Sequence, residues 1–367
     1  MKRLGVCWLG AALVCAVIGL GWTAPSLAAP QGKIVIAQGV DPTTLDPQWH
    51  EETPAYNVLL NIYDTLLFRD KDLKIIPWLA TSWKLVTPTT WEFKLRQGVR
   101  FHNGEAFDAD AVKFSIDRLR DPKLGNRQAG NFRLVTAVEV VDTFTVRIVT
   151  SKPFPTMENQ LALRGAVMAP KHFAGKDKTF ADRNPVGTGP YKFVRWAKDD
   201  QLVLEANDGW WGGAPKVKTI VYRPIPEHAV RVAALQGGEV DIAVNIPPHL
   251  VPIIDKHPKL YIMYLIGWGN TTWDADGTLT PLFRSGNPLA NNHNPDFDGM
   301  MDEAQTTVDP TRRQEIYAKA QRLMLDDGAV LPLYQQMDLY GVNKRVGFQA
   351  LSSEQIVGVW LSLKDGK

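Results

Sequence analysis

Hydrophobic and polar positions divide the chain into many short segments of two kinds. Apolar residues that alternate, or cluster between turn residues, predict strands over 33–38, 91–95, 135–141, 143–149, 191–196, 202–206, 217–222, 240–244, 261–267, 330–335 and 339–342. Apolar residues at a helical spacing predict helices over 56–68, 109–119, 227–236, 247–256, 297–308 and 310–325. Strands and helices mix without a strict alternation, so we expect a mixed α/β (α+β) fold rather than a regular barrel.

Local signals mark several of these element ends. Asp108 precedes the predicted helix 109–119 as an N-cap, and Gly237 follows the helix 227–236 as a C-cap. Asp142 separates two strand-like runs, which is typical of a hairpin. Pro310 occupies the first turn of the last long helix, where its missing N–H costs nothing.

The first 28 residues have the pattern of a secretory signal peptide. Lys2 and Arg3 precede an apolar run over 9–20, and small residues at Ser26 and Ala28 suit a signal peptidase. We therefore expect cleavage near Ala28 and a periplasmic location. A membrane anchor is the alternative, but the apolar run is shorter than the roughly 20 residues that a span needs.

Both cysteines and the small excess of positive charge belong to this leader. Cys7 and Cys15 lie inside it, so the remaining chain has no cysteine for disulfides or thiolate metal sites. The 367 residues carry 41 Lys and Arg against 39 Asp and Glu, a net charge of +2. A nucleic-acid-binding protein would carry a strongly basic face, so we expect no nucleic-acid partner.

No arrangement of residues predicts catalysis, a metal or a cofactor. The seven histidines form no i,i+3 or i,i+4 pair, and no Gly-x-Ser-x-Gly elbow occurs. The glycine-rich segment 187–190 lacks the Lys of a phosphate loop, and the acidic segments 274–277 and 296–299 do not complete a calcium loop. We expect a protein that is not an enzyme.

Tryptophan is the residue type that points to binding. Ten of the twelve lie after the leader, many beside turns. We expect Trp83, Trp91 and Trp196 to be core residues. The others fit a cleft in which aromatic rings cover an amphipathic ligand and a few polar groups orient it.

Several motifs together resemble the extracellular solute-binding proteins of the peptide/nickel class (family 5), which serve ATP-binding-cassette importers. They are WEFKLRQGVRFHNG at 91–104, FDADAV at 107–112, TLDP at 44–47, PWLA at 77–80, NPVGTGPY at 184–191, NDGWW at 207–211, GEVD at 238–241, GW at 267–268, DPTRR at 309–313 and LPLY at 331–334. The resemblance covers nearly the whole chain after the leader.

The resemblance implies a two-lobed architecture of the periplasmic-binding-protein type II kind. After the signal peptide at 1–28, it assigns 29–52 and 165–255 to the first-lobe core, 53–164 to a first-lobe subdomain, 256–329 to the second lobe and 330–367 to a return to the first lobe. Family members look like chains of about 500 residues. Here Leu260 is followed almost at once by Trp268, which predicts an internal deletion in a truncated second lobe and exposed strand edges.

The resemblance also implies which residues line the cleft. They are Asp41, Pro42 and Thr43 after the first strand, Asn245 at the lobe crossover, and Trp268, Gly269, Asn270 and Thr271 after the Gly-Trp pair. Dipeptide binders of the family carry an Asp at the position of Thr271 for the ligand ammonium group. Asp274 or Asp276 could replace it, or could instead cap the turn.

These expectations define one function and two alternatives. The chain would bind a peptide or another small solute between its lobes and deliver it to membrane permease subunits, working as a monomer without a cofactor. Alternatively, it is an internally deleted remnant that binds nothing, or an exported scaffold or chaperone-like protein that keeps the first lobe.

Overall fold

The computed structural model describes residues 30–70, 74–266, 274–286, 293–327, 337–351 and 355–364. The predicted signal peptide lies outside them. In the described part of the chain, no helix combines the length and apolar character needed to cross a bilayer.

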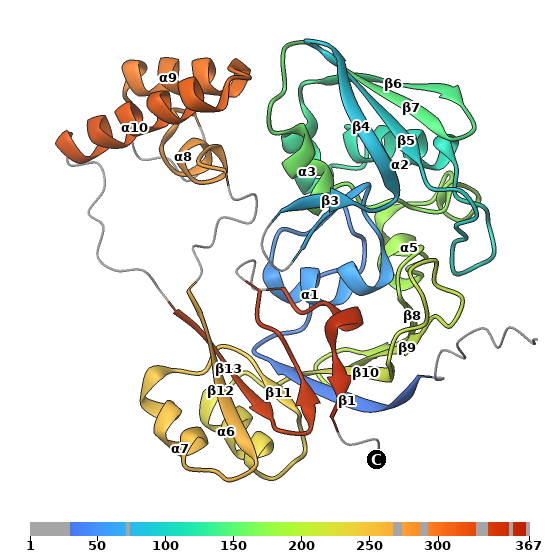
Figure 1. The fold of residues 1–367 in the computed structure, drawn as a ribbon, viewed down its shortest axis with the longest axis vertical. Coiled ribbons are helices and arrows are strands. Elements are labelled where there is room, and N and C mark those ends of the chain that lie inside the picture. The colour runs from blue at the N-terminus through green and yellow to red at the C-terminus, as the bar shows by residue number, and fades with distance from the viewer. Residues whose placement is uncertain are drawn as a thin grey trace, which may run out of the picture.

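Two main sheets and a group of helices build the molecule (Figure 1). The seven-stranded sheet has, in spatial order, β12 (Leu260–Ile266), β13 (Met337–Asn343), β11 (Ile242–Ala243), β1 (Gln31–Gln38), β10 (Val217–Pro224), β9 (Gln201–Ala206) and β8 (Tyr191–Ala197). The four-stranded sheet has β4 (Ala80–Thr87), β5 (Thr90–Leu95), β7 (Thr145–Thr150) and β6 (Val135–Asp142). Two-stranded ribbons join β2 (Leu67–Arg69) to β3 (Ile75–Pro77) and β14 (Val346–Gly347) to β15 (Ser362–Leu363).

The helices are α1 (Thr53–Ile62), α2 (Ala109–Arg120), α3 (Met157–Leu163), α4 (Pro170–Phe173), α5 (Lys178–Arg183), α6 (His228–Gln236), α7 (Val251–Asp255), α8 (Asp276–Phe283), α9 (Pro295–Thr306) and α10 (Pro310–Asp326). Short 3₁₀ turns cover Arg127–Phe132, Pro248–Leu250 and Gly358–Trp360. The predicted mixed α/β class is confirmed. The predicted cap is confirmed as well, since the Asp108 side chain accepts a hydrogen bond from the backbone N–H of Ala111.

The seven-stranded sheet is buried on both faces. Along β1, Ile34 and Ile36 belong to the large core shared with the four-stranded sheet, whereas Val35 and Ala37 pack with α6 and α7 on the opposite face. Successive side chains of a strand point to opposite faces. This is why the strand reads as a continuous apolar run rather than as an alternating one.

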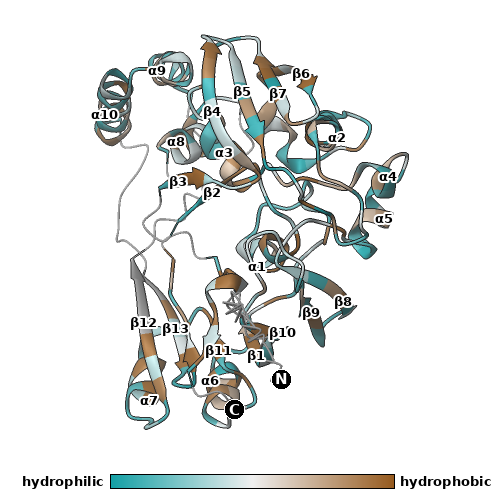
Figure 2. Cartoon of the chain, turned by 45° about the vertical axis from the view of Figure 1, so that its right-hand side comes forward, coloured by the Kyte–Doolittle hydropathy of each residue, from teal (hydrophilic) through white to brown (hydrophobic). Residues whose placement is uncertain are grey.

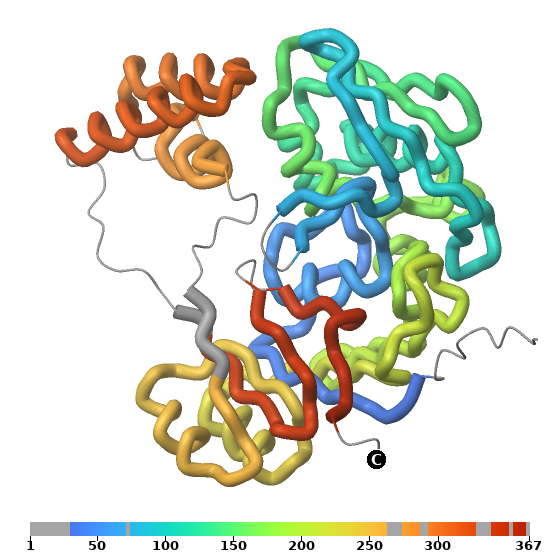
Figure 3. Tube along the Cα trace, in the orientation of Figure 1, coloured from blue at the N-terminus to red at the C-terminus, as the bar shows by residue number. Residues whose placement is uncertain are grey.

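The helix α1 lies inside the molecule and joins the sheet to the C-terminal segment (Figure 3). All its residues from Ala55 to Ile62 are buried. The Asn57 and Asn61 side chains accept hydrogen bonds from the backbone N–H groups of Ile356 and Gly358, at 2.9 and 2.6 Å. The two asparagines are one helical turn apart and therefore share a face, which explains polar residues in so apolar a helix.

The helix predicted over 56–68 ends earlier than expected, at Ile62. Tyr63 has extended backbone angles, φ −114° and ψ 130°, and the chain continues into β2. The apolar residues Leu66 and Leu67 that continued the helical period are buried from extended backbone instead. The reason lies at Asp64, whose side chain enters a tryptophan cluster.

The buried carboxylate of Asp64 collects donors from three separate segments. Its Oδ1 accepts the indole N–H of Trp78 at 2.7 Å. Its Oδ2 accepts the hydroxyl of Thr188 at 2.9 Å and the indole N–H groups of Trp211 at 2.8 Å and Trp210 at 3.3 Å. Burial raises the pKa of Asp64 above its ordinary value, and the four donors oppose that shift. These tryptophans therefore hold the first lobe together.

The helices α8, α9 and α10 form a separate group with a small core of their own. That core contains Phe297, Met301, Ile316 and Met324. Both views place the group apart from the seven-stranded sheet and beside α3 (Figures 1 and 2). Its contact with the first-lobe subdomain includes a hydrogen bond of 2.6 Å from Arg133 Nη2 to Gln305 Oε1.

One strand of the predicted second-lobe segment lies in the seven-stranded sheet. The strand β12 was assigned to the second lobe with the rest of 256–329, but it pairs along its whole length with β13 in the seven-stranded sheet. Its apolar residues Leu260 and Ile262 pack with the core on the α6 side, which accounts for this placement. The helical group is what remains of that segment, and the predicted internal deletion stays a prediction.

We expect Asp64→Asn to lower the free energy of unfolding by about 3 kcal/mol. The new amide N–H₂ would face indole donors, leaving buried donors without acceptors at a cost of about 1–3 kcal/mol each. Guanidinium unfolding followed by tryptophan fluorescence measures the loss. Asp208→Asn, in the same turn as Trp210 but exposed, is the control and should change stability by less than about 0.5 kcal/mol. Equal losses would contradict the role of Asp64.

Candidate functional site

Several predicted site residues leave the seven-stranded sheet at one edge. The strand β1 runs parallel to β10 and β11. Because β13 is antiparallel to both β11 and β12, β12 also runs in the direction of β1. The carboxyl ends of these four strands therefore lie at the same edge, which we call the carboxyl edge. Ligands of open α/β sheets bind outside such edges.

The carboxyl edge carries the loop with Asp41, Pro42 and Thr43 after β1, and Asn245 two residues after β11. The residues that follow β12 also start from this edge. Four of the predicted site residues, Trp268, Gly269, Asn270 and Thr271, lie outside the described residues. The topology thus brings Asp41–Thr43 and Asn245 to one region of the fold.

The loop after β1 uses its own side chains to hold its shape. Asp41 Oδ2 accepts the backbone N–H of Asp199 in the β8–β9 turn. Thr43 donates from its hydroxyl and, at 3.3 Å, from its backbone N–H to Glu52 Oε1. Pro42 is buried. Asp41 Oδ1 is buried too and has no hydrogen-bond partner among the described residues.

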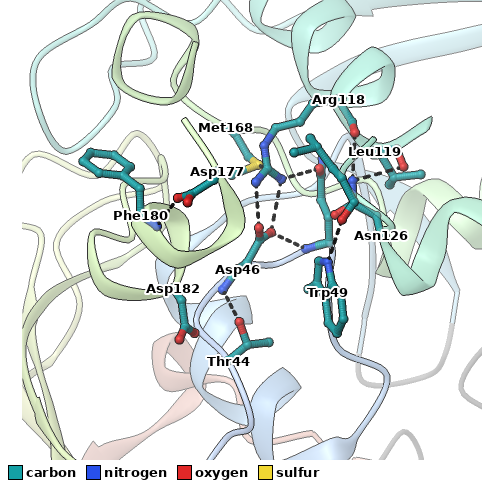
Figure 4. Close-up of polar contacts among 12 residues, drawn as sticks. Thr44, Asp46, Trp49, Arg118, Leu119, Asn126, Met168, Asp177, Phe180 and Asp182 are labelled. Atoms are coloured by element: carbon teal, nitrogen blue, oxygen red, sulfur yellow. Dashed lines mark hydrogen bonds and ion pairs between the residues drawn. The ribbon is translucent and has the colours of Figure 1, made fainter. Parts of the chain in front are cut away.

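A buried ion pair anchors this loop to α2 (Figure 4). Arg118 Nη2 contacts Asp46 Oδ2 at 2.7 Å, and Arg118 Nη1 contacts Asp46 Oδ1 at 3.2 Å. The same guanidinium donates to Gln48 Oε1 at 2.6 Å. Paired N–H···O bonds between a guanidinium and a carboxylate fix direction as well as distance. The TLDP motif is thus structural, and it holds the candidate loop in place.

Asn245 is exposed and has a left-handed backbone, with φ 53°. Asparagine is among the few non-glycine residues that tolerate this conformation. Its side chain faces solvent beside the carboxyl edge, and its backbone carbonyl accepts a hydrogen bond of 3.2 Å from Arg231 Nη2.

Asp274 lies in the helical group, where its carboxylate is already engaged. Both its oxygens pair with the Arg313 guanidinium, with Nη2 at 2.7 Å from Oδ1. Its Oδ1 also accepts the backbone N–H of Asp276 at 2.9 Å, a hydrogen bond that closes the turn before α8. A pocket of about 390 Å³ borders this pair and is also lined by Gln314, Tyr317 and Gln321.

His50, at the end of the loop after β1, is buried as a neutral side chain. Its ring meets Tyr56 edge-on at a centroid distance of 4.3 Å. Burial lowers its pKa to about 4, with the Glu52 carboxylate opposing the shift and Arg164 reinforcing it.

Two buried charged residues, Asp64 and Arg231, were not among the predicted site residues. Asp64 stands outside every quoted motif, but each of its four donors lies in one. Arg231 is a buried cation among Val232, Leu235 and other apolar residues of α6. The sequence did offer a signal for Arg231, since this arginine lies on the apolar face of the predicted helix 227–236. The described residues include no cluster of three or more His, Cys, Asp or Glu side chains placed to hold a metal.

Residues 74–262, just over half of the chain, match the family described as "Bacterial extracellular solute-binding proteins, family 5 Middle". The chain belongs to this family. The glutathione-binding protein GsiB of Pectobacterium atrosepticum is 36% identical over 255 residues, which make up 67% of this chain and 49% of that protein. GsiB of Salmonella typhi is 34% identical over 244 residues, 65% and 47% of the two chains. The family 5 chain thus spans about half the length of these curated relatives.

Solved structures agree on the fold of this family 5 chain. The ABC transporter substrate-binding protein CtaP of Listeria monocytogenes has a TM-score of 0.81 at 18% identity, covering 92% of this chain and 100% of that one. The periplasmic binding protein DppA of Helicobacter pylori, solved with the peptide STSA, has a TM-score of 0.75 at 19% identity, covering 91% and 98%. The predicted two-lobed periplasmic-binding-protein fold is therefore confirmed, while its truncation stays a prediction.

We expect His50 to make the fold less stable in acid. The folded state keeps the imidazole neutral until about pH 4, whereas the unfolded chain binds a proton below about pH 6.5. Stability therefore falls as the pH drops from 6.5 to 4, by up to about 3 kcal/mol. Urea unfolding at pH 7 and pH 4.5 measures the total loss, to which His102 also contributes because burial lowers its pKa to about 4.

His50→Gln should reduce that pH dependence, whatever it does to stability at pH 7. The control is His249→Gln at an exposed position, which should leave the dependence unchanged. If His50→Gln loses as much stability in acid as the wild type, burial of a neutral His50 is not the cause.

Proposed function

We propose that this family 5 protein is the exported solute-binding component of an ATP-binding-cassette importer, and that it binds a short peptide or a peptide-like solute such as glutathione. The observation that carries the proposal is the family match over 74–262, which includes β10, β11 and the start of β12. The relatives of 34–36% identity are named for glutathione binding. Solved neighbours include a dipeptide-binding protein with Met-Leu and AppA with a nonapeptide.

The ligand would be held by non-covalent contacts at the carboxyl edge. Asp41–Thr43 and Asn245 would supply hydrogen-bonding groups from two neighbouring strand ends, with Trp268–Thr271 continuing the surface. Asp274 is a less favourable anchor for a ligand ammonium group, because its carboxylate already pairs with Arg313. A chain that only binds and releases its solute needs no catalytic group.

Binding would be coupled to lobe closure. The helical group α8–α10 follows β12 in the chain and precedes β13, and both strands meet the carboxyl edge. A solute that contacts this edge and the helices at once would favour the closed arrangement over the open one. We propose that the closed monomer is the form presented to permease subunits from the periplasm.

A thermal-unfolding screen tests the proposal. The chain without its first 28 residues is heated with glutathione, with di- to pentapeptides and with buffer alone. A solute that binds the native state at about 100 times its Kd stabilises it by about 2.7 kcal/mol, a rise in Tm of several degrees. Titration calorimetry then gives the Kd. A cooperative melt that no solute shifts would favour the scaffold alternative, and a broad melt would favour the deleted remnant.

We expect Asn245→Gly to weaken solute binding about 2- to 10-fold, the effect of one lost hydrogen bond of about 0.5–1.5 kcal/mol. Glycine adopts φ 53° without strain, so the variant removes the side-chain amide and keeps the backbone. Calorimetry with the solute found in the screen measures the effect, and Tm should hardly change. An unchanged Kd would remove the Asn245 side chain from the site.

A further inference from the structure

Arg231 is a large charged side chain buried at the carboxyl edge. Only 1% of its surface is exposed, although arginine is among the residues least often found inside proteins. It belongs to the first turns of α6, the helix that follows β10. Its guanidinium lies within the fold.

The guanidinium donates to the loops after two different strands. Its Nη1 donates to the carbonyl oxygens of Ile225 and Pro226, the latter at 2.9 Å, in the segment that leaves β10. Its Nη2 donates at 3.2 Å to the carbonyl oxygen of Asn245, after β11, and also to His228 Nδ1. One planar group thus joins the ends of β10 and β11.

The strand between these two is β1, and Arg231 spans its end. The sheet order places β1 between β11 and β10. A Cβ atom built on Gly39, the residue that follows β1, would stand 3.5 Å from Arg231 Nη1. The guanidinium therefore underlies the start of the loop that carries Asp41 and Thr43. All three strand ends meet at this one side chain.

The hydrogen bonds of Arg231 to two separate loops require a guanidinium group. Its acceptors among the described residues are three carbonyl oxygens and an imidazole nitrogen, with no carboxylate among them. Guanidinium presents its donors in a rigid planar fork, whereas a lysine ammonium is a compact point charge on a flexible stem. Lysine could reach one of the two loops but could not hold both in register.

We infer that Arg231 is a positioning residue that sets the mutual placement of the loops after β10, β1 and β11, and thereby the solute affinity of the carboxyl edge. The inference rests on the proposed function of that edge. Its effect on the loops themselves does not require a ligand. The two parts can therefore be measured separately.

The first measurement is amide hydrogen exchange on the protein without solute. We expect Arg231→Lys to speed exchange in segments 39–43 and 245–250 about tenfold, because two bridging hydrogen bonds are lost. The four-stranded sheet should exchange as in the wild type. Arg223→Lys, on β10 with a side chain 37% exposed, is the matched control and should leave both regions unchanged.

A milder variant keeps the test decisive if Arg231→Lys does not fold. His228→Phe removes one hydrogen-bond partner of the guanidinium from an exposed residue. It should speed exchange in the same segments by a smaller factor. Faster exchange throughout the molecule, the four-stranded sheet included, or no change in these segments, would overturn the inference.

The second measurement is the affinity for glutathione, or for the peptide that the thermal screen finds, by calorimetry. Arg231→Lys should raise Kd about tenfold while Arg223→Lys leaves it unchanged. Loosened loops with an unchanged Kd would overturn the link between Arg231 and affinity. If the wild type binds none of these solutes, the proposed function fails, yet the exchange pattern still decides whether Arg231 positions the loops.

Discussion

The carboxylate of Asp64 is the interaction on which the first lobe depends. It satisfies the indole N–H groups of Trp78, Trp210 and Trp211 and the hydroxyl of Thr188, which come from three segments far apart in the chain. A buried carboxylate is costly unless donors surround it. The same donors would be costly without the carboxylate. This mutual requirement fixes where α1 ends and where the chain turns into β2, and it joins the four-stranded subdomain to the main sheet.

With the lobe fixed in this way, the carboxyl edge becomes a defined surface. Parallel pairing of β1 with β10 and β11 brings together loops that are far apart in sequence. The Asp46–Arg118 pair holds the loop after β1 from the α2 side, and on the α6 side Arg231 bonds to the loops after β10 and β11, next to Gly39. Arg118 and Arg231 each carry a guanidinium group, whose several donors can connect more than one segment. Loops held in place in this way suit a binding protein. A site with loose loops binds its solute more weakly, because ordering those loops on binding costs free energy.

Much of the fold could be predicted because local pattern and tertiary burial agree. The β6–β7 and β8–β9 hairpins, the capped helix α2 and the helices α9 and α10 all have apolar faces that match their own periods. The prediction failed at 63–68, where leucines kept a helical spacing but the chain is extended. There a single long-range demand, the burial of Asp64 among indoles, outweighs a local preference worth less than about 1 kcal/mol per residue.

The sequence by itself determined the mixed α/β class and the family, and it supplied the proposal for the binding loops, because motifs and periodicity are local properties of the chain. Only the tertiary structure decided that β12 belongs to the main sheet, that Asp274 is paired with Arg313, and that Trp78, Trp210 and Trp211 serve a buried carboxylate rather than an open cleft. The physical reason is that hydrogen-bond partners and sheet neighbours are chosen in space. The spacing of residues along the chain does not predict that Arg231 lies beneath Gly39.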